Sequence, residues 1–84
     1  MFKMKSEKEL RENIEQILGK RVSAIKNKMR EYPPKVVGRN IAFASEEIED
    51  FRRAEKFANL AGVDIRSYSQ EVEDALEPYY RHSR

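Results

Sequence analysis

The pair Pro33-Pro34 limits most strongly how this chain can fold. Proline cannot donate a helical hydrogen bond and pushes the preceding residue out of the α region, so any helix that starts near the N-terminus must end here. Ser6 and Glu9 form a capping box that predicts the start of such a helix. Apolar residues then recur at helical spacing, at Leu10, Ile14, Ile17, Leu18, Val22, Ile25, Met29 and Tyr32. Gly19 interrupts this stripe, which leaves open whether one helix or a helix pair carries it.

After the prolines the apolar pattern becomes extended. Residues 36–43 are typical of a strand covered on both faces, and residues 63–67 alternate like a second, shorter strand. Ser45 and the acidic turn after it predict a helix between them, with Phe51, Ala54, Phe57, Ala58 and Ala61 on its inner face. A last helix, capped by Ser67 or Ser69, carries Val72, Ala75 and Leu76 until Pro78 stops or kinks it. We therefore predict a small, helix-rich α/β fold, in which an N-terminal helix or helix pair precedes a β-α-β-α unit with a two-stranded parallel sheet.

Short motifs in the second half of the chain support the β-α-β arrangement. The segment Val36-Val37-Gly38-Arg39-Asn40-Ile41 precedes a helix with Ala54 and Ala58, and Gly62-Val63-Asp64-Ile65-Arg66-Ser67-Tyr68-Ser69 follows it. This half resembles the third domain of bacterial translation initiation factor 2, although polar Gln70 and Glu71 stand where that family has apolar residues, its Arg-Pro pair is absent, and there is no GTPase domain. The resemblance implies a non-catalytic connector and an association with the ribosome.

The same residues also permit a helix-turn-helix. Ala58 and Gly62, followed by Val63, match the turn of that motif, whose second helix enters the major groove of DNA. Against this, Ile65 would place a large apolar group in an exposed turn, and the last helix would turn its acidic residues toward phosphates. A tight bend at residues 63–67 would favour this DNA-binding alternative over the sheet, and another helical packing is the third possibility.

Length and composition predict one domain. The 84 residues leave room for a single core, with flexible tails expected at 1–5 and 81–84. Because there is no cysteine, neither a disulfide nor a Cys-based zinc site can stabilise the fold, so core packing or self-association as a homodimer must do so. No apolar run is long enough to span a bilayer, and no apolar segment typical of a secretory signal follows Met1, so we expect no membrane contact and a cytoplasmic location.

Charge divides the chain into a basic and an acidic half. Residues 1–39 hold eleven Lys or Arg against five Glu, a net charge of +6, and residues 40–84 hold six against ten acidic residues, a net charge of −4. The basic stretch that we predict to contact nucleic acid consists of Lys20, Arg21, Lys26, Lys28, Arg30, Lys35 and Arg39. The alternative is that these residues form a solvated face that pairs with the acidic half or with a neighbouring subunit.

The sequence offers no catalytic machinery. His82 is the only histidine and lies close to the C-terminus, no serine has a nucleophile-elbow context, and the three glycines are isolated, so we predict no catalytic residue, no metal and no cofactor. A protein partner would instead use an apolar seam, for which Val22, Ile25, Met29, Tyr32 and Tyr80 are the candidates, or an unpaired sheet edge.

Two function classes follow. The first is a small accessory or regulatory protein that contacts nucleic acid or a ribonucleoprotein through the basic stretch. The second is a protein-interaction module, such as an inhibitor, regulator or assembly subunit, that acts through the apolar seam or the sheet edge. A helix-turn-helix regulator is the second alternative.

Overall fold

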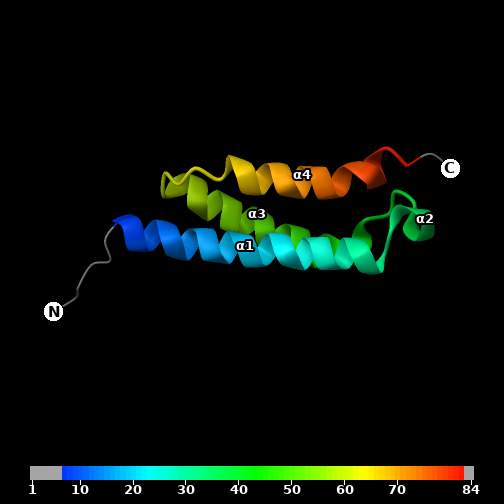
Figure 1. Ribbon diagram of the computed structural model, residues 1–84, viewed down its shortest axis with the longest axis horizontal. Helices are drawn as coiled ribbons and strands as arrows, with labels where there is room; N and C mark the ends of the chain where they lie inside the picture. Colours follow the sequence, from blue (N-terminus) through cyan, green and yellow to red (C-terminus); the bar gives the residue numbers. More distant parts are fainter. Residues whose placement is uncertain (1–6, 83–84) are drawn as a thin grey trace.

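The computed structural model describes residues 7–82, and this part of the chain contains helices and no strand. The long helices are α1 (Glu7–Glu31), α3 (Ser45–Leu60) and α4 (Arg66–Tyr80), and a one-turn helix α2 (Pro34–Val37) and a 3-10 helix η1 (Ala42–Ala44) join α1 to α3. α3 runs back along α1, and α4 then runs in the direction of α1 (Figure 1). The fold is a three-helix bundle, so the predicted α/β class with a parallel sheet is wrong.

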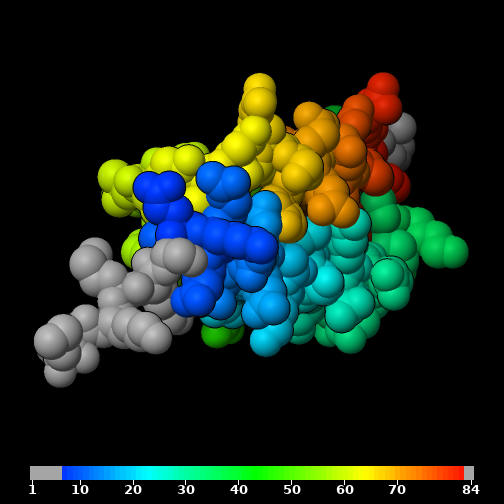
Figure 2. All heavy atoms as spheres, turned by 60° about the vertical axis from the view of Figure 1, so that its left-hand side comes forward, coloured from blue at the N-terminus to red at the C-terminus, as the bar shows by residue number. Residues whose placement is uncertain are grey.

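Helix α1 organises the bundle because both other long helices pack on it. Its buried residues are Ile14, Leu18, Val22, Ile25 and Met29, and they face Phe51 and Ala58 of α3 and Val72, Leu76 and Tyr79 of α4 in one core. The space-filling view shows α4 lying directly on α1 (Figure 2). Full burial of each large side chain stabilises the fold by about 1.5–3 kcal/mol, so this shared core is the main source of stability.

The first helix is not broken at Gly19. α1 continues through this residue because the apolar stripe on either side keeps the same helical phase, and burying the whole stripe outweighs the roughly 1 kcal/mol that glycine costs in a helix interior. Pro33-Pro34 then ends the helix as predicted. The capping box at Ser6 and the tail residues 1–5, 83 and 84 lie outside the described residues.

The first predicted strand, residues 36–43, is replaced by two short helical turns. Pro34 suits the first position of a helix because its fixed φ is helical and its missing N–H is not needed there, and α2 starts on it. Gly38, at φ 64°, ends α2 and donates its N–H to the carbonyl of Pro34. The amide oxygen of Asn40 then accepts the N–H of Ala42 and starts η1. These local bonds leave no extended backbone for a sheet, and therefore no sheet edge for a partner.

The second predicted strand, at residues 63–67, is a bend between α3 and α4. Gly62, at φ 75°, donates to the carbonyl of Asn59, and Val63 donates to the carbonyl of Ala58, which is the Schellman pattern that terminates helices. Asp64 accepts the N–H of Arg66, where α4 begins. The side chains of Val63 and Ile65 are buried and Asp64 is exposed, so the alternation that indicated a strand comes from two loop residues turned into the core.

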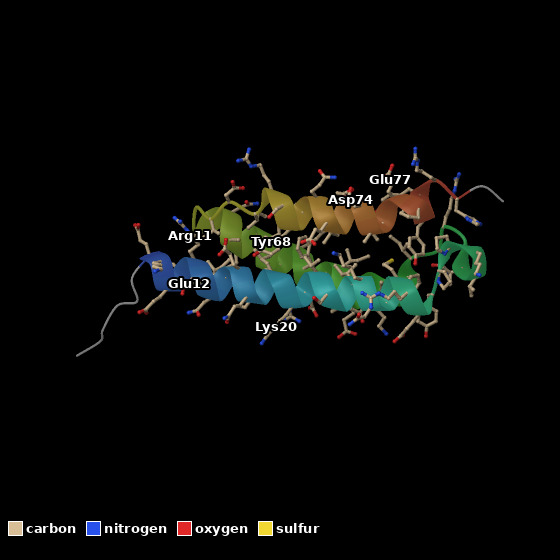
Figure 3. The ribbon with its side chains drawn as sticks, viewed as in Figure 1. Arg11, Glu12, Lys20, Tyr68, Asp74 and Glu77 are labelled. Atoms are coloured by element: carbon tan, nitrogen blue, oxygen red, sulfur yellow. The ribbon has the colours of Figure 1, made fainter. Side chains whose placement is uncertain are left out.

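The bend does not produce a helix-turn-helix arrangement. Helices of that motif cross steeply, at roughly 90–120°, whereas α3 and α4 run in opposite directions along α1 (Figure 1). Asp74 and Glu77 lie on the outer side of α4 (Figure 3), where a recognition helix would need to accept phosphates. The bundle corresponds to the third possibility, another helical packing.

Tyr79 fixes the end of α4 against the end of α1. Its side chain is buried and its ring packs at 5.9 Å from that of Phe43. Its hydroxyl lies within hydrogen-bond distance of two carbonyls, that of Met29 at 2.9 Å and that of Tyr32 at 2.6 Å, which share its single hydrogen. Burial raises the pKa of the Tyr79 hydroxyl above its ordinary value of 10.0. This anchor lies one residue after Pro78, and α4 continues to Tyr80 despite the proline. Of the two effects predicted for Pro78, that it stops or kinks the helix, the first is therefore wrong.

The substitution Tyr79→Phe removes the hydroxyl that bonds to the carbonyls of Met29, in the last turn of α1, and of Tyr32, just after that helix. We expect the free energy of unfolding to fall by about 1–2 kcal/mol, measured by urea denaturation followed by circular dichroism. Tyr80→Phe is the matched control because Tyr80 is exposed, and it should change the free energy of unfolding by less than about 0.5 kcal/mol. Equal effects of the two substitutions would contradict the anchoring role of Tyr79.

Candidate functional site

The predicted basic residues do not form one surface. Lys20 projects away from α3 and α4 (Figure 3), whereas Lys35 lies on α2 and Arg39 follows it at the far end of the bundle. The guanidinium of Arg39 donates to the carbonyl of His82 at 3.0 Å. Arg21, Lys26, Lys28 and Arg30 are distributed over both sides of α1. The predicted basic stretch is continuous in the sequence, but its side chains project from different sides of α1 and from the segment after it.

Three of these cations pair with acidic residues of the other helices. Arg21 lies 3.5 Å from Asp50 of α3, Lys28 lies 3.7 Å from Glu47 of α3, and Lys26 lies 2.8 Å from Glu71 of α4. Such solvent-exposed pairs contribute only about 0–1 kcal/mol each. The basic and acidic halves thus meet within one chain, which is the pairing that we considered as the alternative to nucleic-acid contact.

The predicted apolar seam is divided between the core and the surface. Val22, Ile25 and Met29 are buried within the bundle, where they pack against α3 and α4 instead of being presented to another chain. Tyr32 and Tyr80 are exposed, and the ring of Tyr32 packs on Phe43 with centroids 4.9 Å apart. The structure therefore does not bring these five residues together into one interface.

A different apolar surface lies between α1 and α3. We call it the α1/α3 groove, and it encloses about 270 Å³. Its lining consists of Ile14, Ile17 and Arg21 from α1 and Asp50, Arg53, Ala54 and Phe57 from α3. Ile14 is buried and forms part of the floor, whereas Ile17 is 48% exposed and Phe57 is 58% exposed. Two large apolar side chains from neighbouring helices thus remain in contact with water at a concave site.

Two leucines extend the apolar surface beyond the groove. Leu10 lies two turns before Ile17 on the same side of α1, and Leu60 lies one turn after Phe57 on α3. Because α1 and α3 run in opposite directions, both leucines lie toward the same end of the bundle. Leu60 is 81% exposed and Leu10 is 40% exposed. The surface is therefore long enough to contact about two to three turns of a helix.

Charged side chains line the other end of the groove. Asp50 lies between two arginines, with one carboxylate oxygen 3.5 Å from Arg21 and the other 3.0 Å from Arg53. Arg53 also lies 3.8 Å from Glu49. Arg21 and Arg53 and the two carboxylates that they contact, those of Asp50 and Glu49, carry no net charge together, and Asp50 is shared by both guanidinium groups. The side chains of Arg21 and Arg53 nevertheless remain 48% and 73% exposed at this end of the groove.

Sequence reasoning placed Phe57 on the inner face of its helix and Ile17 in the core stripe, and therefore missed this groove. Phe51 and Ala58 are buried as predicted, but Phe57 points to the side of α3 and is exposed. The positions of Ile17 and Phe57 around their helix axes could have revealed their exposure. Ile17 is rotated by about 100° from Leu18 around α1, and Phe57 by a similar angle from Ala58 around α3, so both lie at the edge of the stripe they were assigned to.

Residues 7–82 provide neither a metal site nor a membrane-spanning helix, and Tyr68 is one of the side chains whose pKa is shifted. No group of three His, Cys, Asp or Glu side chains in this range could hold a metal ion, and none of the described helices is long and apolar enough to cross a bilayer. Tyr68 of α4 lies between α4 and α1 (Figure 3), and burial raises the pKa of its hydroxyl, with the nearby carboxylates of Glu15 and Glu71 adding to the effect. A phenol whose pKa is raised stays protonated at neutral pH.

Comparison with known proteins gives no relative: no protein-family model matches the chain, and no similar protein is found among curated proteins or solved structures.

If Phe57 is not needed for folding, its removal should cost little stability. We expect Phe57→Ala to lower the free energy of unfolding by less than about 1 kcal/mol, because the side chain is already largely in water. Phe51→Ala, on the same helix but with a side chain only 1% exposed, should cost about 3–5 kcal/mol. Urea denaturation of both variants measures the difference, and a large loss for Phe57→Ala would show that this side chain belongs to the core.

Proposed function

We propose that the protein is a non-catalytic interaction module that binds an α-helix of a protein partner in the α1/α3 groove. The observation that carries the proposal is the exposure of Ile17 and Phe57 on opposite sides of this groove, above the buried side chain of Ile14. An amphipathic helix binds in such a groove by inserting apolar residues spaced three or four positions apart. As part of this proposal we place the protein in the cytoplasm, since a chain without cysteine has no need of an oxidising compartment.

The shape of the bundle supports a helical ligand. α1 and α3 are antiparallel neighbours, and α4 packs along the other side of α1. A further helix laid between α1 and α3 would cover Ile17 and Phe57 and convert the three-helix bundle into a four-helix one. Helix packing of this kind needs only complementary apolar side chains on the incoming helix, with crossing angles near 20°.

Selection of helical peptides from a library with randomised charge and apolar positions would test the proposal. We expect selected peptides to bind the wild-type protein and to bind the double variant Ile17→Ala/Phe57→Ala at least tenfold more weakly, measured by fluorescence polarisation, because both anchors of the groove are lost. Val36→Ala is the matched control, since Val36 is also apolar and exposed but lies on α2, away from the groove. Peptides that bind the wild type and the double variant equally, or a selection that yields no binder, would refute the proposal.

Nucleic-acid contact is the second candidate. It is supported by the four residues of the predicted basic stretch that have no ion-pair partner in the described part of the chain, namely Lys20, Arg30, Lys35 and Arg39. Arg30, Lys35 and Arg39 share the end of the bundle where α1 ends and α2 follows. Phosphate contacts made by such residues would depend steeply on salt.

Electrophoretic mobility of a duplex and a single strand at low and physiological salt separates the two candidates. A helix-binding module should retain neither nucleic acid, because its cations are dispersed and partly paired. Retention at micromolar protein that is lost on raising the salt, and that is weakened by Lys35→Gln/Arg39→Gln but not by Phe57→Ala, would favour nucleic-acid binding instead.

A further inference from the structure

We infer that the helix bound in the α1/α3 groove is acidic, with Asp or Glu side chains beside its apolar stripe that pair with Arg21 and Arg53. This inference rests on the proposed function and specifies the chemistry of the partner. It follows from the position of the two arginines, one on each helix that forms the groove, and from the exposure of their guanidinium groups, which their contacts with Asp50 and Glu49 leave partly open to solvent.

Both guanidinium groups keep donors available for a ligand. The contact of Arg21 with Asp50 is an ion pair at 3.5 Å, and Arg53 makes one hydrogen bond to Asp50 at 3.0 Å and a longer contact to Glu49 at 3.8 Å. The side chain of Arg53 is 73% exposed. Since a guanidinium offers several N–H groups in a planar fork suited to carboxylates, most of these donors still face solvent.

One neighbouring cation agrees with an acidic ligand. Lys56 adjoins Phe57 in the sequence and is exposed with no ion-pair partner among residues 7–82, whereas Lys20 projects away from α3 (Figure 3). The acidic residues on this side of α3 that lie outside the lining, Glu46 and Glu49, are found toward the start of that helix, beyond Asp50. A basic helix would meet Arg21 and Arg53 at the groove itself, where like charges repel and lower the affinity.

The spacing of the groove residues defines the ligand further. Leu10 and Arg21 are eleven positions apart on α1, which corresponds to about 16 Å along the helix, or three turns. A partner helix of this length would place apolar residues at positions i, i+4 and i+7 against Leu10, Phe57 and Ile17, because α3 is antiparallel to α1 and Asp50 lies beside Arg21. Its carboxylates would lie about one turn from the last apolar residue, within reach of the arginines.

Two helical peptides with the same apolar stripe test the inference, one with Glu and one with Lys at the flanking positions. We expect the Glu peptide to bind at least tenfold more tightly than the Lys peptide at low salt, measured by fluorescence polarisation, with a smaller ratio at high salt. Arg21→Gln/Arg53→Gln should weaken the Glu peptide about tenfold and leave the Lys peptide no weaker. Arg52→Gln is the matched control, since Arg52 adjoins Arg53 but does not line the groove and pairs with Glu55.

The outcomes separate this inference from the proposed function. Equal binding of the two peptides, with both weakened by Ile17→Ala/Phe57→Ala, would overturn the acidic partner and leave the groove as a docking site. If neither peptide binds, or if binding is unchanged by Ile17→Ala/Phe57→Ala, both the acidic partner and the proposed helix-binding function are overturned. Sedimentation that shows a wild-type dimer, which Phe57→Ala converts to a monomer, would also overturn the inference, because the occupant of the groove would then be a second copy of the chain.

Discussion

Burial of the apolar stripe of α1 is the interaction on which the rest of the structure depends. Leu18 and Ile25 lie at the centre of this stripe and are fully buried, because α3 covers it from one side and α4 from the other. The stripe is wider than the two helices can cover, since Ile17 lies about 100° around α1 from Leu18. On the α3 side the groove is lined by the small side chain of Ala54, and Ile17 remains 48% exposed. The α1/α3 groove is therefore a consequence of how the core is shared.

The distribution of charge follows from the same arrangement. A basic helix lies between two helices rich in acidic residues, and Arg21, Lys26 and Lys28 each find a carboxylate on one of them. Exposed pairs of this kind contribute little stability. Like charges between packed helices would repel, however, so the opposite charges of α1 and of the other two helices favour the packing of α3 and α4 on α1. These three ion pairs offset half of the +6 charge of the basic half and three of the four net negative charges of the acidic half without a ligand. The side chain of Arg53, beside the groove, stays 73% exposed.

The sequence predicted the helical segments well and the connections poorly. The periodic stripe of α1, its end at Pro33 and the buried faces of α3 and α4 at Phe51, Val72 and Leu76 all agree with the structure, because helical periodicity over several turns is a strong signal. Both predicted strands were wrong because short apolar runs do not distinguish a strand from short helical turns, as at residues 36–43, or from a loop that turns its side chains inward, as at residues 63–65. The glycines decided the outcome: Gly38 and Gly62 adopt positive φ and end helices, and the Schellman bonds at Gly62 place Val63 in the core. The groove could not be predicted because it depends on which residues of the α1 stripe are covered by α3, and the packing of two helices is not visible in the periodicity of either one.

The composition of the groove is difficult to explain by folding alone. A phenylalanine on the exposed side of a helix has a lower helix propensity than lysine or glutamate, and an exposed leucine such as Leu60 promotes aggregation, so neither Phe57 nor Leu60 benefits the free bundle. A partner that covers these side chains would turn that disadvantage into binding energy. The arginines on either side of the groove serve both states. In the free protein their charge favours solubility of the apolar surface and their methylene groups can lie along it. In the complex that we propose, the same charge would select a partner of opposite sign.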